Sequence, residues 1–179
     1  MRTKGERSKQ HILEVASMLF SKNSFKNVTI RQIAKEAGIS PSLIYKYFHT
    51  QEDLYYAALQ SACQDLLERL KTIDRLEDFV HEYLRYMFSS ALFEMMSYFS
   101  LEHDSSKNFI PISNEINKFL QLLEEKISGP NAKIEAQLLF STLNGLIISY
   151  KKVPRDTEAK IATIQKLADY YIANLKKRI

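Results

Sequence analysis

The chain has 179 residues, of which 45% are hydrophobic and 26% charged, with 4 Gly and 4 Pro. The hydrophobic fraction favours a folded core over disorder, and the scarcity of Gly and Pro argues against a β architecture with many turns. A single cysteine, Cys63, excludes an internal disulfide, and the charged start leads to no apolar signal core or membrane-length stretch, so we expect a soluble, cytoplasmic protein.

The positive charge is concentrated at the start of the chain. Residues 1–50 carry 9 Lys/Arg and 3 Glu, a net charge of +6, whereas the remainder has a net charge of −2. A basic head on a slightly acidic body favours contact with a polyanion. Ordinary solvated charge is the alternative, and the asymmetry alone does not decide between them.

Helical spacing and capping residues predict the first two helices. The first runs from about residue 5 to 21, with apolar residues on one face. The second begins after Thr29, which matches a capping box with Gln32. Gly38 ends that helix, because glycine readily adopts the positive φ of a helix C-terminus.

The third and fourth helices have their own start signals. Ser40 is a suitable N-cap, and Pro41 follows at the first helical position, where its missing N–H costs nothing. Residues 50–53 form another capping-type pattern, which opens a long helix that ends near Lys71.

The rest of the chain is predicted to add four or five helices, so the fold class is all-α. Pro111, the pair Gly129-Pro130 and Pro154 divide this part of the chain. Between them, apolar residues repeat at i, i+3, i+4 and i+7. The apolar stripes cover residues 76–91, 112–127, 134–153 and 161–175, with a Met/aromatic segment at 93–99.

Two short helices separated by the turn at 38–40 have the shape of a helix-turn-helix. In this motif the second helix lies in the DNA major groove with its N-terminal residues at base edges. The residues expected at the DNA are Ser40, Pro41 and Ser42, with Tyr45, Lys46 and Tyr47 suited to phosphate oxygens and His49 as a further phosphate candidate. A place in the core is the alternative for the two tyrosines, and helical spacing sends them to different faces.

One segment, residues 8–56, carries a family pattern. It includes Phe20, the run 25–40 and the run 44–54, where the turn, the caps, Tyr-x-Tyr-Phe and Glu-Asp-Leu fall at characteristic offsets. In these residues the chain resembles the TetR family of transcriptional regulators. The resemblance implies about nine helices, with a three-helix DNA-binding domain at 1–50 (motif about 29–48) and a helical-bundle domain for ligand sensing and dimerisation at 51–179.

The resemblance also implies a mode of action. Each head of a homodimer would bind half of a palindromic operator, and a small molecule in the body would lower the affinity for DNA. By motif position, phosphate contacts are implied for Thr29, Ser40, Tyr45 and Tyr47, and base-facing positions for Pro41, Ser42 and Leu43.

Three positions depart from the family pattern. Asn23 stands where a glycine is usual before the aromatic residue, and it can take the positive-φ role instead. Gln51 replaces a common phosphate-binding lysine, which removes one ion pair. Leu43 replaces a small or hydroxylated residue, and either meets a thymine methyl group or packs within the head.

The Met/aromatic band of the body is a candidate ligand pocket, because methionine adapts to varied apolar ligands. The alternative is that these residues only fill the core of a bundle. The candidates are Tyr83, Met87, Phe88, Met95, Met96, Phe99, Phe119 and Leu123.

A dimer seam is implied for the last two helices by the family resemblance. Gly145 lies inside a predicted helix, where it costs about 1 kcal/mol relative to alanine. A close contact between helices explains it, and a tolerated weak spot is the alternative. The residues assigned to the seam are Gly145, Ile148, Ile161, Ile164, Ala168, Tyr171 and Ile172.

We recognise no nucleophile–base pair, phosphate loop or metal-binding spacing in the sequence, including among His11, His49, His81 and His103. We therefore expect no enzyme activity, cofactor, metal or membrane partner. The expected partners are double-stranded operator DNA, a second copy of the chain and an unidentified small-molecule effector. A helical protein-interaction module and a regulator that activates transcription are the alternative functions.

Overall fold

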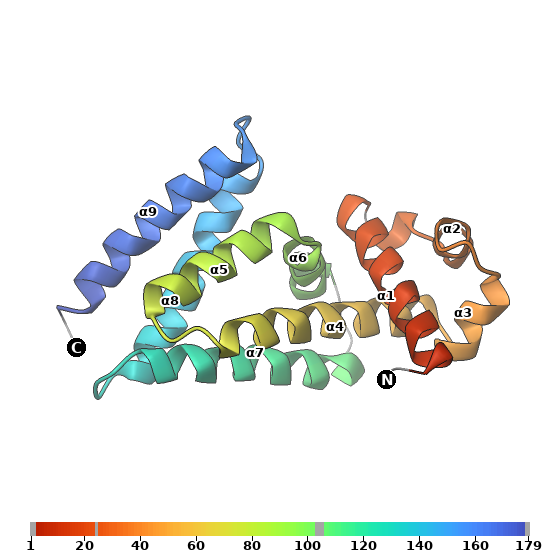
Figure 1. The fold of residues 1–179 in the computed structure, drawn as a ribbon, viewed down its shortest axis with the longest axis horizontal. Helices are drawn as coiled ribbons and strands as arrows, with labels where there is room; N and C mark the ends of the chain where they lie inside the picture. The colour runs from red at the N-terminus through yellow and green to blue at the C-terminus, as the bar shows by residue number, and fades with distance from the viewer. Residues whose placement is uncertain (1–2, 24, 103–105, 178–179) are drawn as a thin grey trace. The chain divides into compact units, whose positions relative to one another are not determined.

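The structure is a computed structural model that describes residues 3–23, 25–102 and 106–177. Within these residues it contains nine α-helices, one short 3-10 helix and no strand (Figure 1), which confirms the predicted all-α fold. The elements are α1 (Lys4–Lys22), η1 (Phe25–Asn27), α2 (Ile30–Glu36), α3 (Pro41–Tyr47), α4 (Gln51–Lys71), α5 (Leu76–Ser89), α6 (Leu92–Glu102), α7 (Ser106–Lys126), α8 (Ala132–Lys151) and α9 (Thr157–Leu175).

Two compact units are interleaved along the chain. Unit 1 takes its described residues from 1–64 and 90–112, and unit 2 from 65–89 and 113–179. The unit that contains the predicted head therefore extends beyond residue 50 and includes the first part of α4 and all of α6. Sequence order alone does not predict this grouping, because α6 is separated from the rest of unit 1 by α5.

Local capping interactions define the turn between α2 and α3. The Thr29 hydroxyl accepts a hydrogen bond from the Gln32 backbone N–H at 3.2 Å, and Gln32 Oε1 accepts from the Thr29 N–H at 2.8 Å. This is the predicted capping box. Gly38 adopts a φ of 65° after α2, and Ser40 Oγ accepts from the Leu43 N–H at 3.3 Å to begin α3. The helix-turn-helix geometry thus follows from a short stretch of sequence.

Asn23 ends α1 without the positive φ that the sequence suggested. Its φ is −134°, in the extended region. Its backbone N–H and its side-chain Nδ2 both donate to the Leu19 carbonyl oxygen at 3.1 Å. The helix therefore ends at an extended residue, and the two donors satisfy the Leu19 carbonyl.

An aromatic cluster holds α6 within unit 1. Phe20, Phe25, Tyr55 and Tyr98 pack with ring centroids 5.1–5.7 Å apart. The Tyr55 hydroxyl donates to the Met95 carbonyl oxygen at 2.5 Å, and burial raises the pKa of this phenol far above its usual range. Tyr55 is therefore a neutral donor that links α4 to α6.

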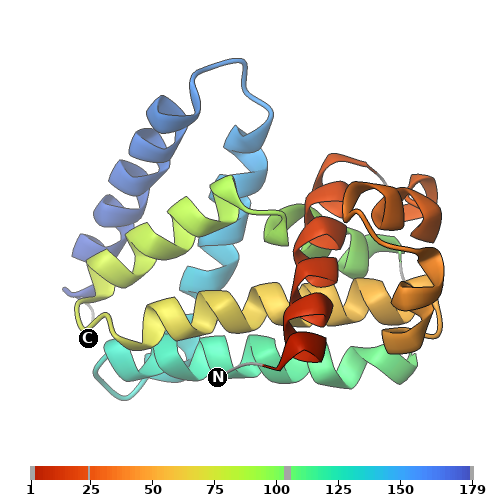
Figure 2. The same cartoon turned by 45° about the vertical axis from the view of Figure 1, so that its right-hand side comes forward.

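In unit 2, α5, α8 and α9 pack against one another (Figures 1 and 2). Three polar pairs join α5 to the α9 segment along one side, and their order shows that the two helices are antiparallel. They are Glu77–Lys176 at 2.6 Å, His81–Asp169 at 2.7 Å and Arg85–Glu158 at 3.5 Å. We call this set the α5–α9 ladder.

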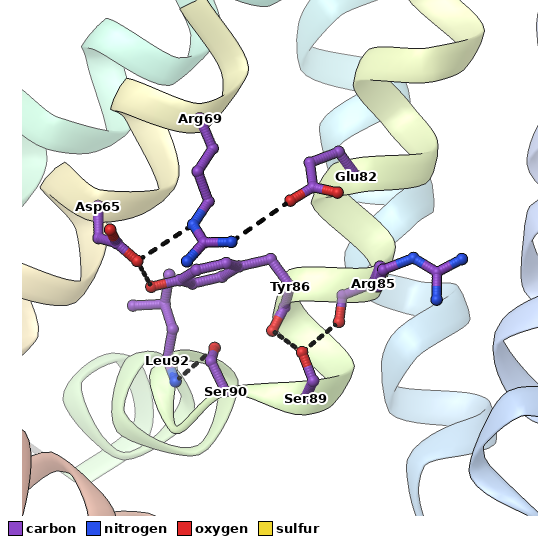
Figure 3. Close-up of polar contacts among 8 residues, drawn as sticks. All are labelled: Asp65, Arg69, Glu82, Arg85, Tyr86, Ser89, Ser90 and Leu92. Carbon is purple, nitrogen blue, oxygen red and sulfur yellow. Dashed lines mark hydrogen bonds and ion pairs between the residues drawn. The ribbon is translucent and has the colours of Figure 1, made fainter.

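A second polar network joins the last turns of α4 to α5 (Figure 3). The Tyr86 hydroxyl donates to Asp65 Oδ2 at 3.0 Å, and Arg69 Nε lies 3.3 Å from the same oxygen. The Arg69 guanidinium also lies 3.9 Å from Glu82 and 5.2 Å from the centroid of the Tyr86 ring. Since Asp65 and Arg69 are about half exposed, their ion pair contributes little to stability.

Candidate nucleic-acid interface

The short helix α3 has an apolar inner face and a polar outer face. Ile44 is fully buried, and Phe48 just after the helix is almost fully buried. Tyr45 is 51% exposed, and Lys46 is exposed beside it. A helix of seven residues is too short to be stable alone, so packing of its inner face must hold it in place.

The start of α3 is open to solvent. Ser40, Pro41 and Ser42 are exposed, and Leu43 is partly buried. The Ser40 hydroxyl lies 2.9 Å from the Ser42 hydroxyl as well as capping Leu43, so the two serines are ordered with respect to the helix. Both alternatives for Leu43, a base contact and packing within the head, are compatible with its partial burial.

The two tyrosines of α3 project differently, as helical spacing predicts. Tyr45 points outward, whereas Tyr47 is partly buried at the start of α1. A Cβ atom added at Gly5 would lie 3.6 Å from the Tyr47 hydroxyl. Tyr47 therefore combines a packing role with a polar tip, and its contact with phosphate stays a prediction.

Gln51 has a defined role within the head. Its Nε2 donates to the Phe25 carbonyl oxygen at 3.1 Å, which ties the start of α4 to η1. Thr29 and His49 are exposed, as DNA contacts require. The roles of all three residues at DNA remain predictions.

Seven of the nine Lys and Arg residues of the head lie exposed in the described part of the chain. None of them belongs to the hydrophobic core that the described residues form. They are Lys4, Arg7, Lys9, Lys22, Arg31, Lys35 and Lys46. Exposed cations of α1, α2 and α3 are therefore available to a polyanion.

The candidate pocket residues fall in both units. Met95, Met96 and Phe99 lie on α6 in unit 1, whereas Tyr83, Met87, Phe88, Phe119 and Leu123 belong to unit 2. All are buried except Met96, which is partly buried. This burial fits both the pocket and the core interpretation, so the pocket stays a prediction.

The unit 2 members form part of an aromatic cluster. The Phe119 ring centroid lies 4.8 Å from Tyr83, 5.3 Å from Phe140 and 5.6 Å from Phe79. The Tyr83 hydroxyl donates to Asn144 Oδ1 at 3.0 Å. We call Phe79, Tyr83, Phe119 and Phe140 the unit 2 aromatic cluster.

Sequence analysis missed Glu115, which is 3% exposed. It lies on α7 between Ile112 and Phe119, at helical spacing from both, so it shares the buried face of α7. An acidic residue within an apolar stripe was the signal that could have found it.

Four of the predicted seam residues are buried within the single chain. Ile161, Ile164, Ala168 and Ile172 have exposed fractions of 2% or less and lie in the interior of the subunit. Periodicity correctly identified an apolar face of α9, but that face packs within the chain. Tyr171 is partly buried, whereas Gly145 and Ile148 are exposed.

A different apolar stripe is exposed on the outer face of α8. It consists of Ile134, Leu138, Gly145 and Ile148, with the exposed Ser141 between them. Ile134 is 59% exposed, Leu138 51% and Ile148 67%. Leu167 and Tyr170 of α9 are the other large apolar side chains of the last two helices that are exposed.

Sequence comparison finds a family match in the head of the chain. Residues 12–58 match the family described as bacterial regulatory proteins, tetR family. An HTH-type transcriptional regulator of Staphylococcus aureus strain MRSA252 is 26% identical over 121 residues, which are 68% of this chain and 63% of that protein. The aligned region thus spans somewhat under two thirds of this relative.

Structural comparison extends the likeness to nearly the whole chain. A transcriptional regulator of Aquifex aeolicus, assigned there to the TerR/AcrR family, superposes with a TM-score of 0.70 at 20% identity and covers 92% of this chain and 99% of its own. FadR of Bacillus subtilis in complex with stearoyl-CoA gives 0.68 at 17% identity, with 89% and 96% covered. A regulator of Saccharomonospora viridis in complex with choline gives 0.73 at 18% identity, with 93% and 96% covered.

The head has the fold of a helix-turn-helix domain. Residues 12–58 match the tetR family, and the structural likeness to TetR/AcrR regulators shows that the chain shares their fold. No described helix is both long and apolar enough to cross a membrane. In the part of the chain that the structure describes, no three His, Cys, Asp or Glu side chains gather as metal ligands; His103 lies outside that part.

Proposed function

We propose that this protein is a ligand-responsive repressor that binds a palindromic operator as a homodimer and is released by a small molecule. The observation that carries the proposal is the polar, exposed outer face of α3 on a basic head that matches the tetR family. Residues 1–50 have a net charge of +6. A duplex can accept such a helix in its major groove.

In this scheme the exposed start of α3 faces the bases. Pro41, Ser42 and Leu43 lie at base edges, and Tyr45 and Lys46 contact phosphates from the outer face of the helix. Phosphate contacts fix the register of the protein on DNA, and base contacts provide the specificity.

The outer face of α8 forms the dimer seam. Its stripe residues at 134, 138, 141, 145 and 148 are spaced alternately by four and three, the pattern with which helices pair along a seam. A Cβ atom added at Gly145 would meet nothing within 4 Å in the subunit, so packing within the chain does not require glycine there. Close approach of a second copy does explain it. Leu167 and Tyr170 of α9 supply further exposed apolar surface.

Effector binding is assigned to the body. Two of the similar structures hold ligands of very different chemistry, stearoyl-CoA in one and choline in the other. The likeness therefore supports a sensing role, whereas the class of effector has to come from the residues of this chain.

Salt dependence of DNA binding tests the proposal against a protein-interaction role. We expect fluorescence anisotropy with DNA that flanks the gene of this protein to show affinity falling steeply with salt, since each phosphate contact releases counterions. Lys46→Ala should weaken binding and reduce the slope of log K against log salt by about 1. Lys22→Ala removes the same charge at the end of α1 and serves as the control. Binding that is absent, or insensitive to salt, contradicts the proposal.

A further inference from the structure

The outer face of α3 carries few of the side chains that usually distinguish one base pair from another. Its exposed residues are Pro41, Ser42, Tyr45 and Lys46, and Leu43 at the edge of this face is partly buried. The helix contains no Arg, Asn or Gln, so Lys46 is its only side chain of the kinds that form paired hydrogen bonds with a purine. Lys46 lies in the second turn, whereas the side chains of the first turn of such a helix reach the base edges. Hydroxyl and apolar groups therefore provide most of the base recognition.

The Ser42 hydroxyl is suited to donate to a base. Ser40 Oγ accepts a hydrogen bond from the Leu43 backbone N–H at 3.3 Å and lies 2.9 Å from Ser42 Oγ. A serine hydroxyl has one proton and two acceptor lone pairs. When Ser40 donates its proton to Ser42, the proton of Ser42 remains for an acceptor outside the protein. Guanine, adenine and thymine all present such acceptors in the major groove, so the hydroxyl alone does not select one base.

Leu43 supplies the selection that the hydroxyl lacks. It follows Ser42 about 100° further round the helix, so the two side chains lie next to each other. Ile44 is fully buried, whereas Leu43 keeps part of its side chain in contact with solvent. Thymine alone among the four bases of DNA presents a methyl group in the major groove, beside its O4 acceptor. A hydroxyl donor next to an apolar side chain matches this pair of groups.

We propose that Ser42 and Leu43 together recognise a thymine in each operator half-site. The Ser42 hydroxyl donates to thymine O4, and the Leu43 side chain packs against the 5-methyl group. This inference rests on the proposed binding of operator DNA by α3, which the family match at residues 12–58 supports, and it names the base that this face selects. Loss of the methyl contact should weaken binding about fourfold for each half-site, as expected for the burial of one methyl-sized group.

Base analogues test the proposal after selection of duplexes from a random-sequence library by the full chain has found the preferred half-site. Deoxyuridine in place of thymidine removes the methyl group and keeps O4. We expect fluorescence anisotropy to show that the wild type binds about fourfold more weakly for each half-site changed at one thymine position. Leu43→Ala should bind both duplexes equally. Ser42→Ala should bind several-fold more weakly than the wild type and keep the full methyl effect, which makes it the matched control. Circular dichroism checks that each variant is folded.

Three results would overturn the inference: a selected half-site without thymine, a wild type that is indifferent to deoxyuridine at every thymine, or an undiminished methyl effect in Leu43→Ala. If Leu43→Ala does not fold, Leu43→Gln takes its place, because it keeps the length of the side chain and presents an amide to the methyl group. Enrichment of a sequence without a methyl effect removes this inference and leaves the DNA-binding role in place. Selection that enriches no sequence, with no salt-sensitive binding of any duplex, removes both.

Discussion

In the proposed dimer, single residues of α8 and α9 separate the surface that packs within a subunit from the surface that contacts a second copy. Ile164 and Ile148 have similar side chains, yet Ile164 is fully buried and Ile148 is 67% exposed. A charge at Ile164 would disrupt the core of unit 2, so loss of dimer there would say nothing about a seam. Ile148 allows the seam to be tested without that ambiguity.

Ile148→Asp should convert the dimer to a monomer, because two carboxylates would be buried near each other where the helices pair. The subunit should stay folded, since the side chain is exposed in the single chain. Light scattering at several concentrations measures the mass. Gln121→Asp adds the same charge on the exposed side of α7 and should leave the dimer intact. A monomeric wild type, or a dimeric Ile148→Asp, would refute the seam.

Particular residues also show which features can be predicted from the sequence and which cannot. The caps at Thr29 and Ser40 and the positive φ of Gly38 follow from local chemistry, and the structure confirms them. The periodicity of α9 identified an apolar face but not the surface that covers it, because covering is a long-range property. Glu115 escaped notice for a similar reason: its burial depends on neighbours that are distant in sequence.

Among the elements, α9 is held to α5 by the ladder of three polar pairs. The Lys176 ammonium lies 2.6 Å from Glu77 Oε1, and this hydrogen bond is the main cause that holds the pKa of the Glu77 carboxyl below its ordinary value. A carboxyl whose pKa is lowered by folding contributes stability above its ordinary pKa. That contribution is lost as the pH falls through the lowered value.

Lys176→Met should therefore lower the free energy of unfolding at neutral pH by less than about 1 kcal/mol, as expected for a partly exposed pair. The difference from the wild type should shrink in acid as Glu77 becomes protonated. Urea unfolding at neutral pH and below the ordinary carboxyl pKa measures both values. Lys177→Met removes an adjacent exposed lysine and should have little effect. A difference that persists in acid would show that the pair is not its cause.

Elements were easier to predict than their grouping. The fourth helix was expected to end near Lys71, as α4 does, because its start signal and apolar spacing are local. The association of α6 with α1 and α4 in unit 1 depends on contacts such as the Tyr55–Met95 hydrogen bond, between residues far apart in sequence. Helical periodicity contains no information about such contacts.

At the scale of the whole molecule, the proposed regulator combines a basic DNA-binding head, a seam for a second copy and a body that senses a ligand. The DNA-binding role proposed for the head is supported by its basic residues, by the family match and by the exposure of α3. Palindromic binding follows if two heads are related by the two-fold axis of a dimer. The two α3 helices would then lie in successive major grooves on one side of the duplex.

A footprint on the DNA that flanks the gene of this protein tests this central claim most directly. We predict two protected half-sites related by a two-fold axis, with centres about one helical turn or a small multiple of it apart. Protection should be lost as salt rises and restored on dilution. If no flanking fragment is protected at low salt, with or without candidate effectors, or if the protected region lacks two-fold symmetry, the structure does not act as proposed.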